Sequence, residues 1–375
     1  MSLPSMPHTS TLTDLDVKRC VSESLSYDGK KLVVRGYGGA LAYHNLDKVE
    51  YMAIENVSHI SLTDIKKLKS LTELSVGRCD GLFPEELDGS IVFHSVKSLK
   101  LHVSHLTRSK SSLSKVLNCF IALSVLVIVG GYEECVMQLP SSSSLQKLTL
   151  SRCEGVVLVP VEKENGGGIQ EDKSLLQSLT IYRCGELFCR WPMGESETIC
   201  PFPASLRKLD VHGEPSMKSM ALLSNLTSLT TLQLDYCSNL TVDGFNPLIA
   251  VNLVQLAVSR CNTFAADMLS EVASQRAKLL LPAGYISRLE KLNVDNICGL
   301  LVAPICNLLA PALHTLEFRY DRRMESFTEE QEKALQLLTS LEKLHFLWCY
   351  GLQSLPQGLH RLSSLKELHV VGCLK

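Results

Sequence analysis

Cysteine is the residue type whose abundance offers this chain the most chemistry. Fourteen cysteines occur in 375 residues, and thiols can form disulfides, bind zinc or act as nucleophiles. Cys184, Cys189 and Cys200 make a loose cluster, but their spacing fits no two-plus-two zinc pattern and no histidine lies close to them. We therefore expect neither a metal site nor a bound cofactor.

Catalytic motifs are absent from the sequence. The eleven histidines could serve as bases for a thiol nucleophile, but nothing in their spacing selects one pair. The chain lacks the G-x-x-x-x-G-K-[ST] phosphate loop, the G-x-G-x-x-G turn, and the H-E-x-x-H and G-x-S-x-G motifs. We predict that the chain is not an enzyme.

Eight of the cysteines stand at one place in a recurring phrase, L-x-x-L-x-[LVIF]-x-x-C. This spacing is the signature of a leucine-rich repeat, in which each unit supplies one short strand to a horseshoe-shaped solenoid. Weaker copies of the phrase fill the gaps, and a faint one lies near residues 32–34. The eight full copies span residues 12–20, 71–79, 145–153, 176–184, 229–237, 253–261, 341–349 and 365–373, and the weaker ones lie at 49–57, 96–101, 123–128, 206–211, 289–298 and 313–318.

These copies predict an α/β fold made of a single solenoid domain over residues 1–375. Alternate strand residues face opposite sides, so the second leucine of the phrase and the residue two places later point into the core. We expect roughly 14–15 repeats, with a concave parallel β-sheet and irregular or short helical convex segments. The repeat cysteines stack in a ladder as buried thiols, which favours a reducing compartment over a disulfide-linked scaffold.

Composition limits the partners. The net charge is −2 and charged residues make up 20% of the chain, so no global field favours nucleic acid or an anionic membrane. No apolar run reaches the roughly 18 residues of a membrane span, and the first twenty residues lack the apolar core of a signal peptide. We expect a cytoplasmic protein that binds other proteins.

Four segments between the expected strands depart from the repeat. Residues 154–175 contain a Gly-Gly-Gly run among charges, which is typical of a flexible surface excursion. Residues 185–205 form an irregular loop with apolar anchors, and residues 262–288 include a helix on the convex side. Thr328 is a suitable N-cap for a further helix within residues 327–340, because glutamates and then apolar residues at helical spacing follow it.

The residue just before the repeat cysteine is an arginine in five copies and a large aromatic in others. Arginine and aromatic side chains are enriched at the energetic centres of protein interfaces. Alternatively, the arginine stems cover the repeat surface and pair with neighbouring carboxylates. By their offset in the repeat, the predicted partner-binding residues are Arg152, Tyr182, Arg183, Tyr236, Arg260, Arg319, Tyr320, His345 and Trp348.

The carboxyl end carries a more specific phrase, in which Leu355-Pro356 turns the chain and Leu359 and Leu362 close the unit. Residues 328–373 resemble the C-terminal repeats of plant disease-resistance proteins of the nucleotide-binding, leucine-rich-repeat class, and look most like the coiled-coil type abundant in grasses. The resemblance implies a module that senses a pathogen effector or a guarded host protein and that holds a nucleotide-binding domain inactive in cis. That nucleotide-binding domain is not in this sequence, so we expect a fragment that lacks it and lacks end caps.

An alternative is the substrate-binding arm of an F-box-type ubiquitin-ligase adaptor, whose repeats also favour cysteine at the strand end. Residues 237–244 (CSNLTVDG) resemble their phrasing. Such adaptors have steadier repeats near 26 residues and a helical F-box ahead of them, and neither feature is visible here. A purely structural solenoid is the third interpretation.

Overall fold

The computed structural model divides the chain into two compact units, unit 1 (Met1–Leu176) and unit 2 (Gln177–Lys375). The structure describes residues 14–20, 23–38, 41, 43, 46–79, 82–83, 91–102, 113–130, 135–137, 144–158, 174–191, 200–278 and 286–373. Most of the expected glycine-rich excursion and residues 192–199 of the irregular loop lie outside these ranges. Phe202 of that loop is buried and packs edge-on against Phe188, as expected of an apolar anchor.

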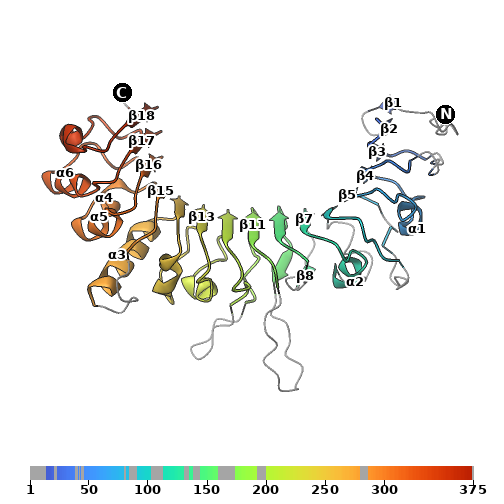
Figure 1. Cartoon of the computed structure of the whole chain (residues 1–375), viewed down its shortest axis with the longest axis horizontal. Coiled ribbons are helices and arrows are strands. Elements are labelled where there is room, and N and C mark those ends of the chain that lie inside the picture. Colours follow the sequence, from blue (N-terminus) through green and yellow to red (C-terminus); the bar gives the residue numbers. More distant parts are fainter. Residues whose placement is uncertain are drawn as a thin grey trace, which may run out of the picture. The chain divides into compact units, whose positions relative to one another are not determined.

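Unit 2 is built on a parallel sheet whose strands follow one another in sequence order (Figure 1). Leucines of successive repeats pair directly in register, as in Leu209 with Leu232 and Leu232 with Leu256, and all are buried. The register confirms the second leucine of the phrase as a core position. The eight strands described for this unit are β11 (Ser178–Tyr182), β12 (Lys208–His212), β13 (Thr231–Asp235), β14 (Gln255–Ser259), β15 (Lys291–Val294), β16 (Thr315–Arg319), β17 (Lys343–Leu347) and β18 (Glu367–Val371).

Unit 1 follows the same plan. Within its described residues, six parallel strands form one sheet and two short strands, β8 (Cys135–Met137) and β10 (Val156–Leu158), pair in a second parallel sheet. The main sheet contains β3 (Lys31–Arg35), β4 (Tyr51–Glu55), β5 (Glu73–Gly77), β6 (Ser98–His102), β7 (Val125–Val129) and β9 (Lys147–Ser151). Together the two units show a leucine-rich-repeat fold, with repeat lengths as irregular as the sequence predicted.

The amino-terminal end differs from the prediction. The phrase at residues 12–20 does not begin a parallel repeat, because β1 (Leu15–Cys20) and β2 (Glu23–Tyr27) pair antiparallel with each other and β2 pairs antiparallel with β3. The β2–β3 pairing follows from a tight turn in which the Asp28 carboxylate accepts the backbone N–H of Lys31 and Gly29 adopts φ +86°. An antiparallel pair therefore stands here in place of the parallel repeat that the phrase predicted.

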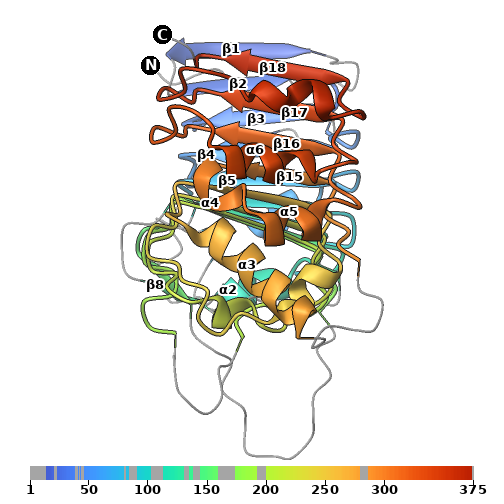
Figure 2. The same ribbon diagram turned by 90° about the vertical axis from the view of Figure 1, so that its left-hand side faces the viewer.

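In each unit the helices lie on one face of the sheet (Figures 1 and 2). The helix expected within residues 262–288 is α3 (Phe264–Ala277). The helix expected after Thr328 is α6 (Glu329–Gln336), and Thr328 forms the predicted N-cap through a reciprocal capping box with Gln331. The other helical segments that the structure describes are α1 (Leu62–Ile65) and α2 (Leu113–Asn118) in unit 1, and η3 (Met220–Leu223), η4 (Pro247–Val251), α4 (Ile297–Leu300), α5 (Ala303–Leu309) and η5 (Gln357–Arg361) in unit 2.

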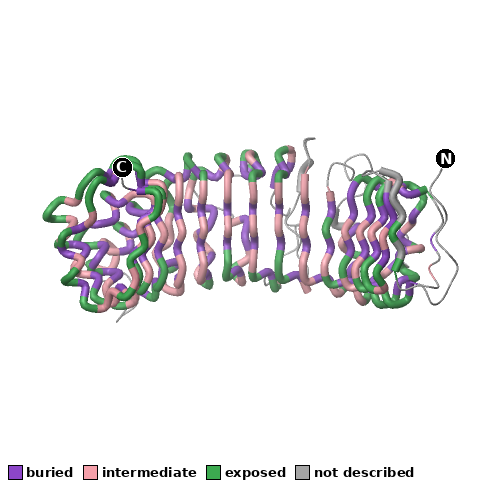
Figure 3. The backbone as a smooth tube through the Cα atoms, turned by 90° about the horizontal axis from the view of Figure 1, so that it is seen from above, coloured by how far each residue is buried: buried purple, intermediate pink, exposed green. Residues whose placement is uncertain are grey.

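The core lies between strands and helices. Buried and half-exposed residues alternate along most strands (Figure 3), as in β12, β13 and β14. Seven of the eight repeat cysteines line this core as predicted, since Cys79, Cys153, Cys184, Cys237, Cys261, Cys349 and Cys373 are buried. The side chain of Cys20 lies outside the described residues. Among the described residues, no helix combines the length and apolar character that crossing a membrane requires.

The thiols also satisfy backbone groups at the strand ends. The Cys373 thiol donates to the carbonyl oxygens of Phe346 and Val371, at 3.2 and 3.4 Å, and its sulfur accepts the backbone N–H of Cys349 at 3.3 Å. A thiol therefore suits this place because it fills a small volume and bonds the neighbouring repeat.

Candidate protein-contact surface

The first, third and fifth residues of the strands of unit 2 point away from the core and form what we call the open sheet face. Unlike the opposite side of the sheet, which the helices cover, this face presents polar, charged and aromatic side chains. Six of the nine predicted partner-binding residues fall into two groups on it or at its edge, where the strands end. Arg183 lies beside the first group, Trp348 lies at the same edge, and Arg152 belongs to unit 1.

The residue that follows most of these strands takes a left-handed backbone conformation. This holds for Arg183, Tyr236, Arg260, Tyr320 and Trp348, with φ between +51° and +61°. Arg152 has φ +54° at the same place in unit 1, and glycines take it in other repeats, at residues 36, 130, 213 and 372. The predicted arginine and aromatic column is thus a column of left-handed residues, which the sequence reasoning missed.

A hydrogen bond explains this conformation. The turn aims the backbone N–H at the last strand residue of the following repeat, so Arg183 donates to the His212 carbonyl at 2.7 Å and Tyr236 to the Ser259 carbonyl at 3.1 Å. A side chain here costs about 1–2 kcal/mol relative to glycine, which adopts the same backbone freely. Large side chains kept at this place therefore need a compensating role, which packing on the open sheet face supplies.

The first group is a cluster of five residues, Tyr182, His212, Tyr236, Arg260 and Tyr320, which we call the aromatic–arginine cluster. The His212 ring stacks on Tyr182 at 4.7 Å between centroids and meets Tyr236 edge-on at 5.5 Å. The Arg260 Cζ atom lies 4.1 Å from the Tyr236 ring centroid and 4.4 Å from that of Tyr320. The cluster is a continuous aromatic and cationic surface along β11–β16.

The position of Arg260 depends on an irregular repeat. In the β15 repeat the cysteine of the phrase is displaced to Cys298, and Asn296 has φ −126° and caps α4. This repeat therefore supplies no left-handed residue between Arg260 and Tyr320. The Arg260 backbone N–H instead donates to the Asp295 carboxylate. Its guanidinium contacts Tyr236 of the preceding repeat and, across the β15 repeat, Tyr320 after β16.

Carboxylates neutralise part of this cluster. The Asp235 carboxylate lies 2.9 Å from His212 Nε2 and 4.0 Å from the Arg260 guanidinium. Burial raises the pKa of Asp210 and the pKa of Asp295. His212 Nδ1 and Asp235 Oδ1 are buried without a hydrogen-bond partner among the described residues. These two atoms can therefore still form hydrogen bonds to a partner or to water.

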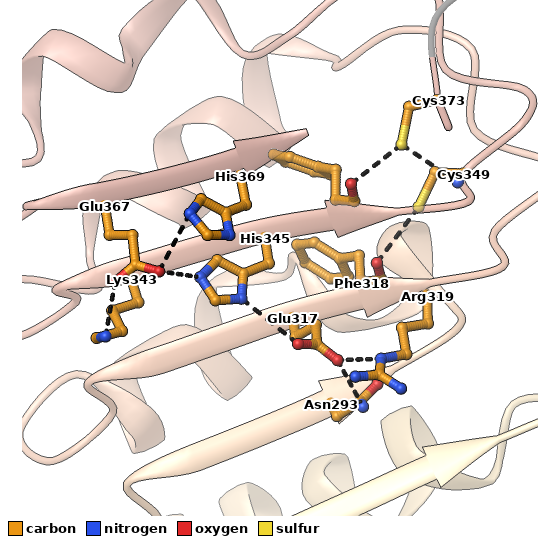
Figure 4. Close-up of polar contacts among 11 residues, drawn as sticks. Asn293, Glu317, Phe318, Arg319, Lys343, His345, Cys349, Glu367, His369 and Cys373 are labelled. Atoms are coloured by element: carbon orange, nitrogen blue, oxygen red, sulfur yellow. Dashed lines mark hydrogen bonds and ion pairs between the residues drawn. The ribbon is translucent and has the colours of Figure 1, made fainter. Parts of the chain in front are cut away.

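The second group is a chain of polar contacts across β15–β18, which we call the carboxylate–histidine network (Figure 4). Glu317 accepts from Asn293 at 2.8 Å and from Arg319, and its second oxygen lies 3.4 Å from His345 Nδ1. His345 Nε2 lies 3.2 Å from Glu367. Two predicted residues, Arg319 and His345, belong to this network, and Arg319 pairs with a carboxylate as the alternative interpretation expected.

The far end of the network holds the next histidine. His369 Nε2 lies 3.4 Å from the Glu367 carboxylate, and its ring stacks on that of His345 at 4.8 Å. Lys343 Nζ lies 2.6 Å from the other Glu367 oxygen. This hydrogen bond lowers the pKa of Glu367 and raises the pKa of Lys343.

The remaining predicted residues have simpler surroundings. Arg183 lies over the Tyr182 ring at 5.4 Å, beside the aromatic–arginine cluster. Trp348 is 43% exposed and packs over Gly372 of the next repeat. Sequence reasoning missed His212, Glu367 and His369 as site residues. Their regular offset within the repeat was the signal that could have found them.

No protein-family model matches the chain, and no curated protein matches it. Solved structures similar to it include an internalin of Listeria monocytogenes, at 14% identity and a TM-score of 0.45, covering 90% of this chain and 86% of the internalin. The circular leucine-rich-repeat protein CroV588 has 15% identity and a TM-score of 0.45, and the match covers 86% of this chain and 43% of the CroV588 chain. A leucine-rich-repeat protein of Leptospira interrogans has 14% identity and a TM-score of 0.32, covering 87% and 79%.

Proposed function

We propose that the chain recognises another protein through the open sheet face of unit 2, with the aromatic–arginine cluster at the centre of the contact. The observation that carries this proposal is the placement of Arg260 between Tyr236 and Tyr320. All three residues occupy a backbone conformation that glycine adopts more easily. Tyrosine and arginine contribute most to interface energy when they are held rigid before binding.

The charge of this surface favours a protein partner over nucleic acid. Asp235 and Asp295 lie beside the Arg260 side chain and backbone, and Glu317 pairs with Arg319. A surface that binds a phosphate backbone gathers unpaired lysine and arginine. The mixed signs here instead suit a partner that presents both charges and an aromatic or apolar anchor.

We further propose that this recognition serves an intracellular plant immune receptor in the cytoplasm. The chain would sense an effector or a guarded host protein and would hold a nucleotide-binding domain of the same receptor inactive. The support is the resemblance of residues 328–373, with the Leu355-Pro356 turn, to the repeats of that receptor class. The adaptor alternative has the phrase at residues 237–244 as its support.

Transcript sequencing followed by a binding measurement tests this proposal. If the transcript that encodes this chain also encodes an upstream nucleotide-binding domain, that domain is expressed separately and titrated against this chain with ADP and then with ATP. We expect binding that is tighter with ADP and that weakens when Tyr236 and Arg260 are both changed to alanine. An upstream F-box in the transcript would replace the receptor proposal with the adaptor. Equal binding with both nucleotides would contradict autoinhibition.

A matched control separates the contact surface from general effects of charge removal. Arg276 lies on α3, on the helical side of unit 2. Arg276→Ala removes the same charge as Arg260→Ala but leaves the open sheet face intact. We expect its binding to equal that of the unmodified chain, and a loss equal to that of the cluster variant would place the contact elsewhere.

A further inference from the structure

We propose that His345, Glu367 and His369 form a binding site for a divalent cation of the zinc type, although sequence analysis expected no metal. The ligand atoms that these side chains offer all lie within 4.8 Å of one another. Two imidazoles and one carboxylate are the ligand set of many open zinc sites. The inference stands on these three residues and does not depend on the proposed function.

Two of the three distances between ligand atoms match those of a tetrahedral ion. The same Glu367 oxygen lies 3.2 Å from His345 Nε2 and 3.4 Å from His369 Nε2. Ligands bound at about 2.0–2.1 Å in a tetrahedron lie about 3.3 Å apart. The His345 and His369 rings are stacked, so binding requires one ring to turn until both Nε2 atoms face the same point. His369, whose side chain is 57% exposed, has room to turn.

The surroundings orient the ligands. His345 Nδ1 faces the Glu317 carboxylate at 3.4 Å, and a carboxylate behind a histidine fixes the tautomer that leaves Nε2 free to bind a metal. Glu317 is itself held by Asn293 and Arg319. Metal-bound histidines are commonly supported in this way.

Lys343 leaves the binding oxygen available. Its ammonium lies 2.6 Å from Glu367 Oε2, while both histidines approach Oε1. Glu367 would therefore bind as a monodentate ligand. Because the three ligands lie on the open sheet face, the remaining coordination positions point toward solvent, where water or a side chain of a bound protein can fill them.

Calorimetric titration of the full chain with Zn²⁺, after removal of bound metal with a chelator, tests the site. We expect one saturable site whose affinity falls at least about tenfold in His369→Ala and by roughly tenfold in Glu317→Gln. His360→Ala is the matched control, since His360 is an exposed histidine of η5 outside the site, and it should bind as the unmodified chain does. Zn²⁺ affinity that is unchanged in His369→Ala would overturn the proposal.

Cobalt supplies an independent readout. Co²⁺ bound by these residues should give the visible absorption of a tetrahedral complex, and the His345→Ala/His369→Ala variant should lack it. Thermal unfolding without metal confirms that the His369→Ala variant and the His345→Ala/His369→Ala variant remain folded. Identical Co²⁺ spectra from the unmodified chain and the double variant would assign the metal to other groups, such as the exposed thiols of Cys189 and Cys298, and would also overturn the proposal.

Discussion

The Arg260 guanidinium carbon lies 4.1 Å from the ring centroid of Tyr236, directly over the aromatic face. The same guanidinium carbon lies 4.4 Å from the ring centroid of Tyr320. An arginine between two tyrosines loses little conformational freedom when a partner covers it, because packing has already ordered its side chain. We expect a partner protein to contact these three side chains.

A double-mutant cycle measures the contact directly. We expect Arg260→Ala and Tyr236→Ala to show a coupling energy of about 0.5–1 kcal/mol, because a partly exposed cation over an aromatic ring contributes this much. Urea unfolding of the two single variants and the double variant supplies the measurement. The effects of Arg276→Ala and Tyr236→Ala on the free energy of unfolding should be additive. Strict additivity of Arg260→Ala and Tyr236→Ala would contradict an energetic interaction between Arg260 and Tyr236.

The left-handed backbone predicts an unusual order of substitutions at Arg183. Arg183→Gly should keep or slightly raise the free energy of unfolding, because glycine adopts φ +51° without steric cost. Arg183→Val should cost about 1–2 kcal/mol relative to the glycine variant, since a branched side chain fits this conformation poorly. Denaturant titration compares them. A valine variant as stable as the glycine variant would contradict the assigned conformation.

Gly372 and Gly185 separate steric collision from backbone strain. Both have positive φ, at +65° and +80°. A Cβ at Gly372 would collide with the Trp348 indole, whereas at Gly185 it meets no other group within 4 Å. We expect Gly372→Ala to be the more destabilising change in thermal unfolding. Combining it with Trp348→Ala should recover part of the loss, and no recovery would show that Trp348 does not pack on Gly372.

Much of this fold could be predicted from the sequence, because the repeat phrase states which strand residues enter the core. The register of Leu209 with Leu232 and the N-cap at Thr328 both confirm patterns that depend on spacing alone. The amino-terminal hairpin was missed although Asp28-Gly29 is a strong turn signal. The leucine phrase over residues 12–20 suggested a parallel repeat, and the turn chemistry determined the actual pairing.

The site was less predictable than the fold. The column of arginines and aromatics was found by its offset, but its backbone conformation was not. Its signal was present, since glycines share the same offset in other repeats, as at Gly213 and Gly372. The placement of Arg260 between two tyrosines depends on the irregular β15 repeat, where Asn296 caps α4. Such a local departure from the repeat is set by packing and cannot be derived from a periodic pattern.

Thiol reactivity should follow burial. Burial raises the pKa of Cys306 and the pKa of Cys349 to about 12 each, so the reactive thiolate is scarce at neutral and mildly alkaline pH. Cys189 and Cys298 are exposed. We expect an alkylating reagent to label the exposed pair in the folded protein and the buried pair only after unfolding. Mass spectrometry of digests locates the label, and rapid labelling of Cys349 in the folded state would contradict its assigned burial.

Quantitative proximity labelling with the full chain in plant cells tests the central claim most directly. Three versions are compared: the unmodified chain, the Tyr236→Ala/Arg260→Ala variant, and Arg276→Ala as the control on the helical side. Recognition through the open sheet face of unit 2 predicts that the cluster variant loses a specific set of neighbouring proteins that the other two versions retain. If all three versions label the same proteins to the same extent, the aromatic–arginine cluster is not the recognition surface.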